Sequence, residues 1–235
     1  MSKARDLADG TFDTDTLVVD AANNRVGIGT ASPATPLHVD GGDIRTTARY
    51  LAGSTGVSTP DYSFASDGSM GMYRVPGSLC FSTGGTERVR VDASGRVTMP
   101  YQPAFTAIHT PGGNLTTDGT FRVKPFTTVL TNIGSHYNSS NSRFTAPVSG
   151  TYYFSSYNLQ LDNVASHFIF AKNGTDLWGN AAARAITANS NEANVAIQAY
   201  LTLSANDYVE VQYKKTGGSG NVYTGHAGFS GYLVG

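Results

Sequence analysis

Apolar and polar side chains alternate along two neighbouring segments near the C-terminus of this 235-residue chain. The apolar positions are Val195, Ile197, Ala199, Leu201 and Leu203 in the first segment and Val209, Val211 and Tyr213 in the second. A period of two places such side chains on one face of an extended strand, and Asn206-Asp207 supplies turn residues between the segments. The pattern therefore predicts an antiparallel pair of strands with one buried face.

Similar short apolar runs recur through the C-terminal half, and no convincing long helical pattern interrupts them. We expect further strands at residues 104–109, 121–130, 143–146, 151–158, 167–172 and 226–234. Strands at this frequency, in a chain with 27 glycines and 11% aromatic residues, indicate an all-β antiparallel sandwich or jelly roll. A single larger domain is expected over residues 101–235.

The charge of the chain does not point to nucleic acid or to a membrane as a partner. Only 14% of the residues are charged and the formal net charge is -1, so no broad basic or acidic surface is expected. Cys80 is the only cysteine, which excludes an intrachain disulfide. The start of the chain lacks the apolar core of a signal peptide, and no run approaches transmembrane length. We therefore expect assembly in a cytoplasm and no membrane insertion.

Two small β-rich segments, residues 1–45 and 46–100, are expected ahead of the larger domain. The first reads as one or two hairpins, and none of its short strands can bury a core alone. An imperfect repeat relates residues 18–26 to residues 90–97: Val-Val-Asp-Ala-Ala-Asn-Asn-Arg-Val returns as Arg-Val-Asp-Ala-Ser-Gly-Arg-Val. Both copies predict a strand, a turn and a second strand. An ordinary hairpin used twice is the simplest explanation of the repeat.

The residues of these segments are more specific than the hairpin pattern. The runs are Val26-Gly27-Ile28-Gly29-Thr30, Ser32-Pro33, Leu37-His38-Val39, Asp61-Tyr62-Ser63-Phe64, Gly71-Met72-Tyr73-Arg74, Leu79-Cys80-Phe81-Ser82 and Glu87-Arg88-Val89-Arg90-Val91-Asp92. In this order they resemble recurrent segments of tail-fibre and related appendage proteins of tailed phages, over most of residues 16–99. The resemblance implies shaft or linker modules of an elongated virion protein, with the first segment attached to other virion proteins. It identifies no catalytic residue.

Seven residues of the larger domain fall at the intervals of the complement-1q globular-head motif: Phe126, Asn132, Tyr137, Phe144, Gly150, Tyr152 and Phe154. The motif ends in an aromatic residue two positions later, where this chain has Ser156, with Tyr157 one residue on. The run from Gly228 to Leu233 resembles the last strand of that family and adds Phe229 and Gly231. The resemblance implies a ten-stranded jelly roll that forms compact homotrimers and is related to the tumour necrosis factor fold.

The residue types themselves favour structural roles for the motif. Phe126, Phe144, Tyr152 and Phe154 are large apolar side chains suited to the space between two sheets, and Gly150 suits a tight turn. The segment 151–158 carries Tyr152 and Phe154 on one face and Tyr153 and Tyr157 on the other. Both faces of this strand should therefore be covered, the second one by a trimer interface.

No pattern in the chain indicates an enzyme. The five histidines are scattered, and no zinc, phosphate-loop or dinucleotide motif or Gly-x-Ser-x-Gly elbow is present. We therefore expect no catalytic residue, no cofactor site and no metal centre. Calcium at Asp162, Asp176, Glu192 and Asp207 is a possibility by analogy with loops of some complement-1q relatives, although solvated turn carboxylates explain these residues more simply.

Recognition is expected in loops of the larger domain, because loops on a rigid sandwich can vary without disturbing the core. Residues 134–142, 179–194 and 214–226 are long and polar, and Tyr223 and His226 offer flat rings for receptor contact. Taken together, the features favour a trimeric structural phage fibre whose head contacts the host surface or another protein. A secreted adhesive or lectin-like protein is the alternative, and a capsule-degrading tailspike is a weaker one.

Overall fold

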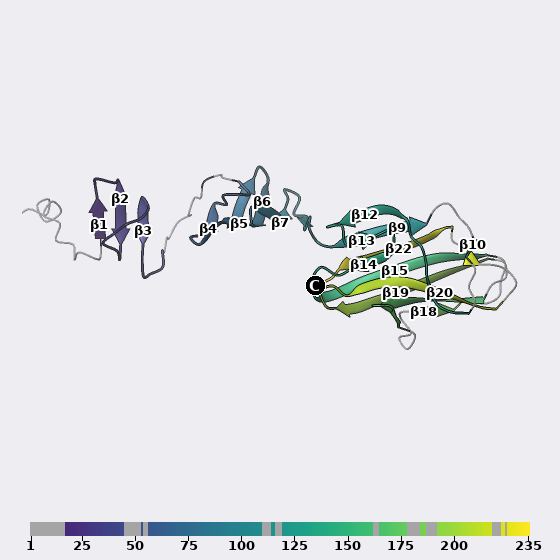
Figure 1. Ribbon diagram of the computed structural model, residues 1–235. Helices are drawn as coiled ribbons and strands as arrows, with labels where there is room; N and C mark the ends of the chain where they lie inside the picture. The colour runs from purple at the N-terminus through teal and green to yellow at the C-terminus, as the bar shows by residue number, and fades with distance from the viewer. Residues whose placement is uncertain are drawn as a thin grey trace, which may run out of the picture. The chain divides into compact units, whose positions relative to one another are not determined.

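The computed structural model describes residues 17–44, 53, 56–109, 114–115, 119–161, 165–177, 184–186, 192–217, 222–223 and 225–235. Within these residues every regular element is a β-strand, in agreement with the all-β prediction. No helix that could cross a membrane is found among them. The chain divides into two compact units, residues 1–53 and 54–235, and the strands form separate sheets along it (Figure 1).

The first unit holds a three-stranded sheet of β1 (Leu17–Asp20), β2 (Arg25–Ile28) and β3 (Leu37–Val39). β1 and β2 form an antiparallel hairpin, which is the first copy of the repeat. β3 then pairs parallel to β2, so it is not part of a second hairpin. The chain returns across the sheet before β3 begins, and Arg25 Nη1 donates a hydrogen bond of 3.0 Å to the carbonyl of Pro33 in the returning segment.

The second unit begins with an antiparallel five-stranded sheet. Its strands, in spatial order, are β4 (Tyr62–Phe64), β5 (Asp67–Val75), β6 (Ser78–Thr83), β7 (Thr86–Val91) and β8 (Val97–Thr98). Tyr73 and Cys80 lie opposite each other on β5 and β6, and both are buried. The hairpin β7–β8 is the second copy of the repeat, and its turn is closed by Asp92 Oδ1, which accepts from Ser94 N at 2.8 Å and from Arg96 N at 3.0 Å.

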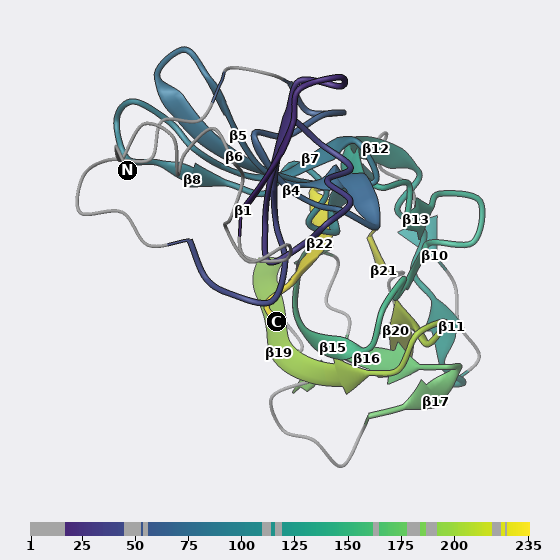
Figure 2. The ribbon, with the colours of Figure 1, turned by 90° about the vertical axis from the view of Figure 1, so that its left-hand side faces the viewer.

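The rest of the second unit is a sandwich of two sheets, which we call the head. A five-stranded sheet has the order β12 (Thr128–Ile133), β9 (Ala104–His109), β22 (Ala227–Leu233), β15 (Gly150–Leu161) and β19 (Glu192–Leu203). A seven-stranded sheet has the order β13 (Tyr137–Asn138), β14 (Arg143–Thr145), β20 (Tyr208–Gly217), β16 (Ala165–Lys172) and β17 (Thr175–Asp176), with β11 (Arg122–Val123) on β20 and β18 (Arg184–Ile186) on β16. The two sheets face each other across the core (Figures 1 and 2).

Two details of the head differ from the sequence-based expectation. Residues 121–130 do not form one strand, because β11 pairs with β20 in one sheet and β12 pairs with β9 in the other. Pro125 lies where the chain crosses between the sheets, and proline has no N–H for a ladder hydrogen bond. The head also has more strands than the ten implied by the resemblance, since β9 to β22 belong to it and several, such as β10 (Asn114–Leu115) and β21 (Val222–Tyr223), are only two residues long.

The core of the head is built from the inward face of both sheets. The alternating apolar residues of segments 195–203 and 209–213 are all in it, as are six aromatic rings of the motif and the last strand. The largest fully buried apolar side chains of the head are Phe105, Phe126, Phe144, Tyr152, Phe154, Phe168, Ile169, Phe170, Leu203 and Phe229. Burying this many aromatic rings supplies the main stabilisation of the head, because each removes a large apolar area from water.

Candidate functional site

Asn132 holds the motif residues of the head in a hydrogen-bonded knot. Its Nδ2 donates to the carbonyl of Tyr137 at 2.8 Å, and its Oδ1 accepts from Tyr137 N at 3.0 Å. The Tyr137 hydroxyl in turn donates to the carbonyl of Phe126 at 2.8 Å, and burial raises the pKa of this hydroxyl to about 12. Phe126 N donates to Ser142 Oγ at 2.8 Å. The knot fixes residues 134–142 against the core, which is a structural role.

The aromatic motif residues form one connected stack between the sheets. Phe105 stacks on Tyr137 and Phe144, with ring centroids 4.7 Å and 5.0 Å away, and meets Phe229 edge-on at 4.8 Å. Phe144 continues the contacts to Tyr152 and Phe154. All of these rings are buried, so the motif offers no aromatic surface to a ligand.

The two motif glycines are explained by close approach. Gly231 lies under the Phe154 ring, which a Cβ would strike. Gly150 is not in the tight turn that was expected. It begins β15 where the chain end passes close by, and a Cβ there would lie 2.9 Å from the carbonyl oxygen of Gly235.

The departure from the motif at Ser156 changes the interior of the sandwich. Ser156 points inward with Asn158, both are buried, and Asn158 Nδ2 donates to Ser156 Oγ at 3.3 Å. Tyr157 does not replace the missing aromatic, because neighbouring residues of a strand point to opposite faces. Its side chain is 55% exposed and lies over Gly228 on the outside of the sheet.

Three cross-strand rows lie in the middle of the outer face of the five-stranded sheet, across β9, β22, β15 and β19, and we call them the outer tyrosine face. The first row is Ala104, Tyr232, Tyr153 and Tyr200; the second is Thr106, Ser230, Ser155 and Gln198; the third is Ile108, Gly228, Tyr157 and Ala196. Tyr153 contacts the rings of Tyr200 and Tyr232 at 5.1 Å and 5.5 Å between centroids. Tyr200 and Tyr232 are nonetheless 65% and 45% exposed.

The outer tyrosine face contains no charged residue. Charged side chains are depleted, and tyrosine is enriched, at the centres of protein interfaces. A large uncharged aromatic face on the solvent side of a sheet therefore has the makeup of a surface that another protein covers.

Comparison with known families agrees with this architecture. The family model of the C1q domain matches residues 104–234. The chain belongs to the C1q-domain family. Proteins with C1q domains often mediate protein or surface contacts, and C1q domains are typically non-enzymatic and commonly form homotrimers. No curated protein sequence matches the chain at a significant level.

Two solved structures are similar to part of this chain. The globular domain of zebrafish complement 1qA protein has 18% sequence identity and a TM-score of 0.45, with 57% of this chain and 98% of that chain covered. Murine APRIL has 11% identity and a TM-score of 0.40, with 56% of this chain and 99% of that chain covered.

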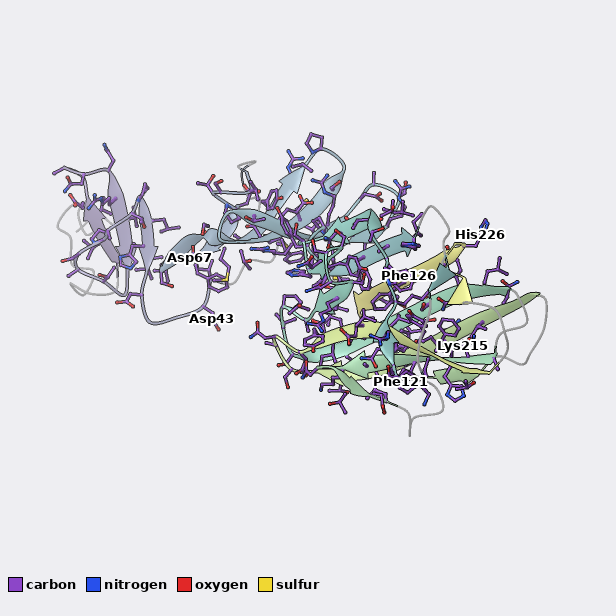
Figure 3. All side chains as sticks on the ribbon, turned by 45° about the vertical axis from the view of Figure 1, so that its right-hand side comes forward. Asp43, Asp67, Phe121, Phe126, Lys215 and His226 are labelled. Atoms are coloured by element: carbon purple, nitrogen blue, oxygen red, sulfur yellow. The ribbon has the colours of Figure 1, made fainter. Side chains whose placement is uncertain are left out.

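The candidate receptor residues belong to one end of the C1q head. Tyr223 is part of β21, which pairs with β10. His226 is exposed, has a φ of 53° and lies at one end of the head (Figure 3). Its carbonyl accepts a hydrogen bond from Leu159 N at 3.3 Å. Of the three candidate loops, only residues 134–142 lie wholly within the described part of the chain.

Of the carboxylates considered for calcium, Asp207 is paired with a lysine. Asp207 Oδ2 is 2.8 Å from Lys172 Nζ, Asp207 Oδ1 accepts from Asn173 Nδ2 at 2.7 Å, and these contacts hold the pKa of Asp207 at about 2. Asp162 lies outside the described residues. Among the described residues no group of three or more His, Cys, Asp or Glu side chains is placed to hold a metal ion.

Two features of the C1q head were missed from the sequence. Tyr200 and Tyr232 complete the aromatic row around Tyr153. The sequence offered one indication, since Tyr200 is an aromatic residue at a position of the 195–203 alternation where a polar side chain is expected. Lys124 is fully buried, with Nζ 6.0 Å from the ring centre of Phe126 and 5.8 Å from that of Phe168. Burial lowers the pKa of Lys124 to about 7.

Proposed function

We propose that this chain is a non-enzymatic structural subunit of a tailed-phage appendage, a homotrimeric fibre whose C1q head contacts the host surface or another protein. The observation that supports the proposed trimer is the outer tyrosine face, which is aromatic, uncharged and half-exposed in a single chain. A second and a third copy covering this face would remove the tyrosines from water, which is the usual driving force of obligate assembly.

The trimer is tested by placing charge on the outer tyrosine face. Tyr200→Glu and Tyr232→Glu should convert a three-chain particle into single chains, because each substitution puts a carboxylate into an apolar contact. The measurement is the molar mass by light scattering after size exclusion. Tyr101→Glu is the matched control, since Tyr101 is 55% exposed and lies outside the head. A single-chain mass for the parent protein would overturn the homotrimer.

The phage assignment rests on residues 16–99, whose segments resemble those of tail-fibre and related appendage proteins. The small sheets β1–β3 and β4–β8 suit shaft or linker modules, because each has few strands and little buried area of its own. We propose that residues 1–45 attach the fibre to other virion proteins and that the protein resides in the virion after assembly in the host cytoplasm.

Particle labelling tests the location. Antibodies raised against the purified chain should decorate an appendage of intact virions, in numbers that are multiples of three. Virions without any labelled appendage, in a preparation where the chain is detected only in the culture medium, would overturn the phage assignment and leave the C1q head intact.

Host contact is proposed for the end of the head that carries Tyr223 and His226. Replacing both with alanine should reduce binding of the full chain to susceptible cells without lowering its melting temperature, because His226 is exposed and outside the core. Binding that survives the double substitution, or that travels with residues 1–100, would assign recognition elsewhere.

The second candidate is a secreted adhesive or lectin-like protein. The C1q family match favours it equally well, since that match covers the head and not the residues that resemble appendage proteins. Detection of the chain outside cells and away from any particle is the outcome that would select this candidate.

A further inference from the structure

The sheet β4–β8 has an apolar patch on one face. Two cross-strand rows make it up: Tyr62, Met72, Phe81 and Val89 in one, and Arg74, Leu79, Val91 and Val97 in the other. We call it the linker face. Arg74 is its only charged residue. Tyr62, Leu79 and Phe81 are each 42% exposed and Val97 is 61% exposed, so large apolar side chains meet solvent in the single chain.

The opposite face of the same sheet is covered at its centre. Tyr73, Cys80 and Ser82 point that way and are 3%, 0% and 2% exposed. The Tyr73 hydroxyl donates to Glu87 Oε2 at 2.7 Å, and Arg90 donates to the same carboxylate. The polar network of Tyr73, Glu87 and Arg90 therefore lies on one face of the sheet, and the exposed apolar rows lie on the other. An antiparallel sheet with one solvated face usually has its polar side chains on the solvated face.

The linker face is too small to hold a free partner. Four strands about 4.8 Å apart, with two rows along each, give an area on the order of 250 Å². A stable interface needs roughly 800 Å² on each partner. A partner must therefore be held nearby by another contact, and in a homotrimer the other two copies are, because linkage to a common assembly raises the effective concentration of each copy.

We infer that the linker face is a second self-association surface, on which β4–β8 of one copy packs against the same sheet of its neighbours. This inference rests on the proposed homotrimer and extends it, since assembly then has two separate contacts along the chain. The outer tyrosine face would supply most of the area, and the linker face would order residues 62–98 into a shaft. The apolar rows of three copies can converge on a threefold axis and exclude water there, and the position of Arg74 at the end of its row lets its guanidinium remain in water.

Cross-linking of the full chain tests the linker face directly. Phe81→Cys and Val97→Cys place thiols in the two rows, and Val97 is exposed at the last strand, so its replacement is the milder one. Ser94→Cys is the matched control, since Ser94 is exposed in the turn beside Val97. The parent protein reports the background from buried Cys80. A short bifunctional maleimide should give at least tenfold more covalent dimer for the two face variants than for Ser94→Cys.

The mass of the same samples separates the possible outcomes. A three-chain mass with strong cross-linking at positions 81 and 97 supports the inference. A three-chain mass with cross-linking no greater than that of Ser94→Cys overturns it, leaves the homotrimer standing, and assigns the face to another part of the chain or to a different virion protein. A single-chain mass overturns the homotrimer itself.

Discussion

Arg90 donates two hydrogen bonds to Glu87, from Nε to Oε1 at 2.8 Å and from Nη2 to Oε2 at 2.7 Å. Residues three apart in a regular strand point to opposite faces, so this pair requires an irregular strand. The register supplies one: Phe81 is opposite Val89 but the next residue, Ser82, is opposite Glu87, which leaves Arg88 in a bulge. The bulge turns Glu87 to the same side as Arg90 and keeps Val89 and Val91 on the linker face.

The Glu87–Arg90 pair should make the β4–β8 sheet sensitive to acid. The hydrogen bonds from Arg90 hold the pKa of Glu87 at about 2. A carboxylate with a lowered folded-state pKa stabilises above its unfolded pKa, near 4.5, and this contribution is lost as the pH falls toward 2. Glu87→Gln should weaken the sheet by about 1–3 kcal/mol at neutral pH and abolish the acid step.

The buried thiol of Cys80 provides the measurement. Its rate of reaction with a pyridyl disulfide that works at acid pH reports opening of the sheet. The rate should rise between pH 5 and 3 in the parent and be high throughout in Glu87→Gln. Ser94→Ala, in the exposed β7–β8 turn, is the control, because Ser94 carries no carboxylate. Equal rates for the parent and Glu87→Gln at pH 7 would contradict the assigned role.

Asn132 should be worth more to stability than other asparagines of the head. Asn132→Ala leaves the N–H and the carbonyl of Tyr137 without their side-chain partner, and each buried polar group that loses its partner costs about 1–3 kcal/mol. Asn138→Ala is the control, because Asn138 is exposed and accepts only from Ser140 N in a turn. Urea unfolding of the two variants should place the midpoint of Asn132→Ala clearly lower. Similar midpoints would show that water replaces the knot.

Truncation of the buried motif rings should sharply reduce soluble trimer. Phe144→Ala and Phe154→Ala each leave a cavity in the ring stack and should cost about 3–5 kcal/mol. Phe64→Ala removes the same atoms from a side chain that is 61% exposed, so it is the control. Thermal melting with soluble yield is the measurement, and parent-like melting of either core variant would mean that its ring is not essential to packing.

The sandwich could be predicted from the sequence because burial in a half-covered strand follows a period of two. Val195, Ile197 and Leu203 are buried as the alternation predicts, and Phe126 and Phe229 are in the core as the family resemblance implies. The division into residues 1–45, 46–100 and 101–235 stays a prediction. The functional assignment to a phage appendage likewise rests on the resemblance of residues 16–99.

What the sequence did not predict depends on register between distant strands. The row of Tyr232, Tyr153 and Tyr200 exists only because three strands far apart in the chain align in one way. No local sequence signal predicts the parallel pairing of β3, because a short strand can pair with the edge of a sheet in either orientation. The sequence does not predict the bulge at Arg88 either, since the bulge depends on the register in which β6 and β7 pair.

Lys124 should make the head more stable in mild alkali than at neutral pH. Burial lowers the pKa of Lys124 from 10.5 to about 7. The pKa of His109 is lowered too, by burial and then by the Lys124 cation. Below pH 7 both the folded and the unfolded chain carry the proton, so the full cost of the buried charge is present. Between pH 7 and 10.5 the unfolded chain binds more protons, and stability therefore rises with pH.

Lys124→Met keeps the length of the side chain and removes the charge. From pH 6 to pH 9.5 the melting temperature of the parent should rise steadily relative to that of the variant, because the parent gains stability over this range and the variant does not. Lys172→Met, which removes a partly exposed lysine paired with Asp207, should differ from the parent by the same amount at every pH. Melting curves of the three proteins at half-unit pH intervals are the measurement. A difference between the parent and Lys124→Met that is constant from pH 6 to 9.5 would mean that Lys124 keeps its proton in the folded head.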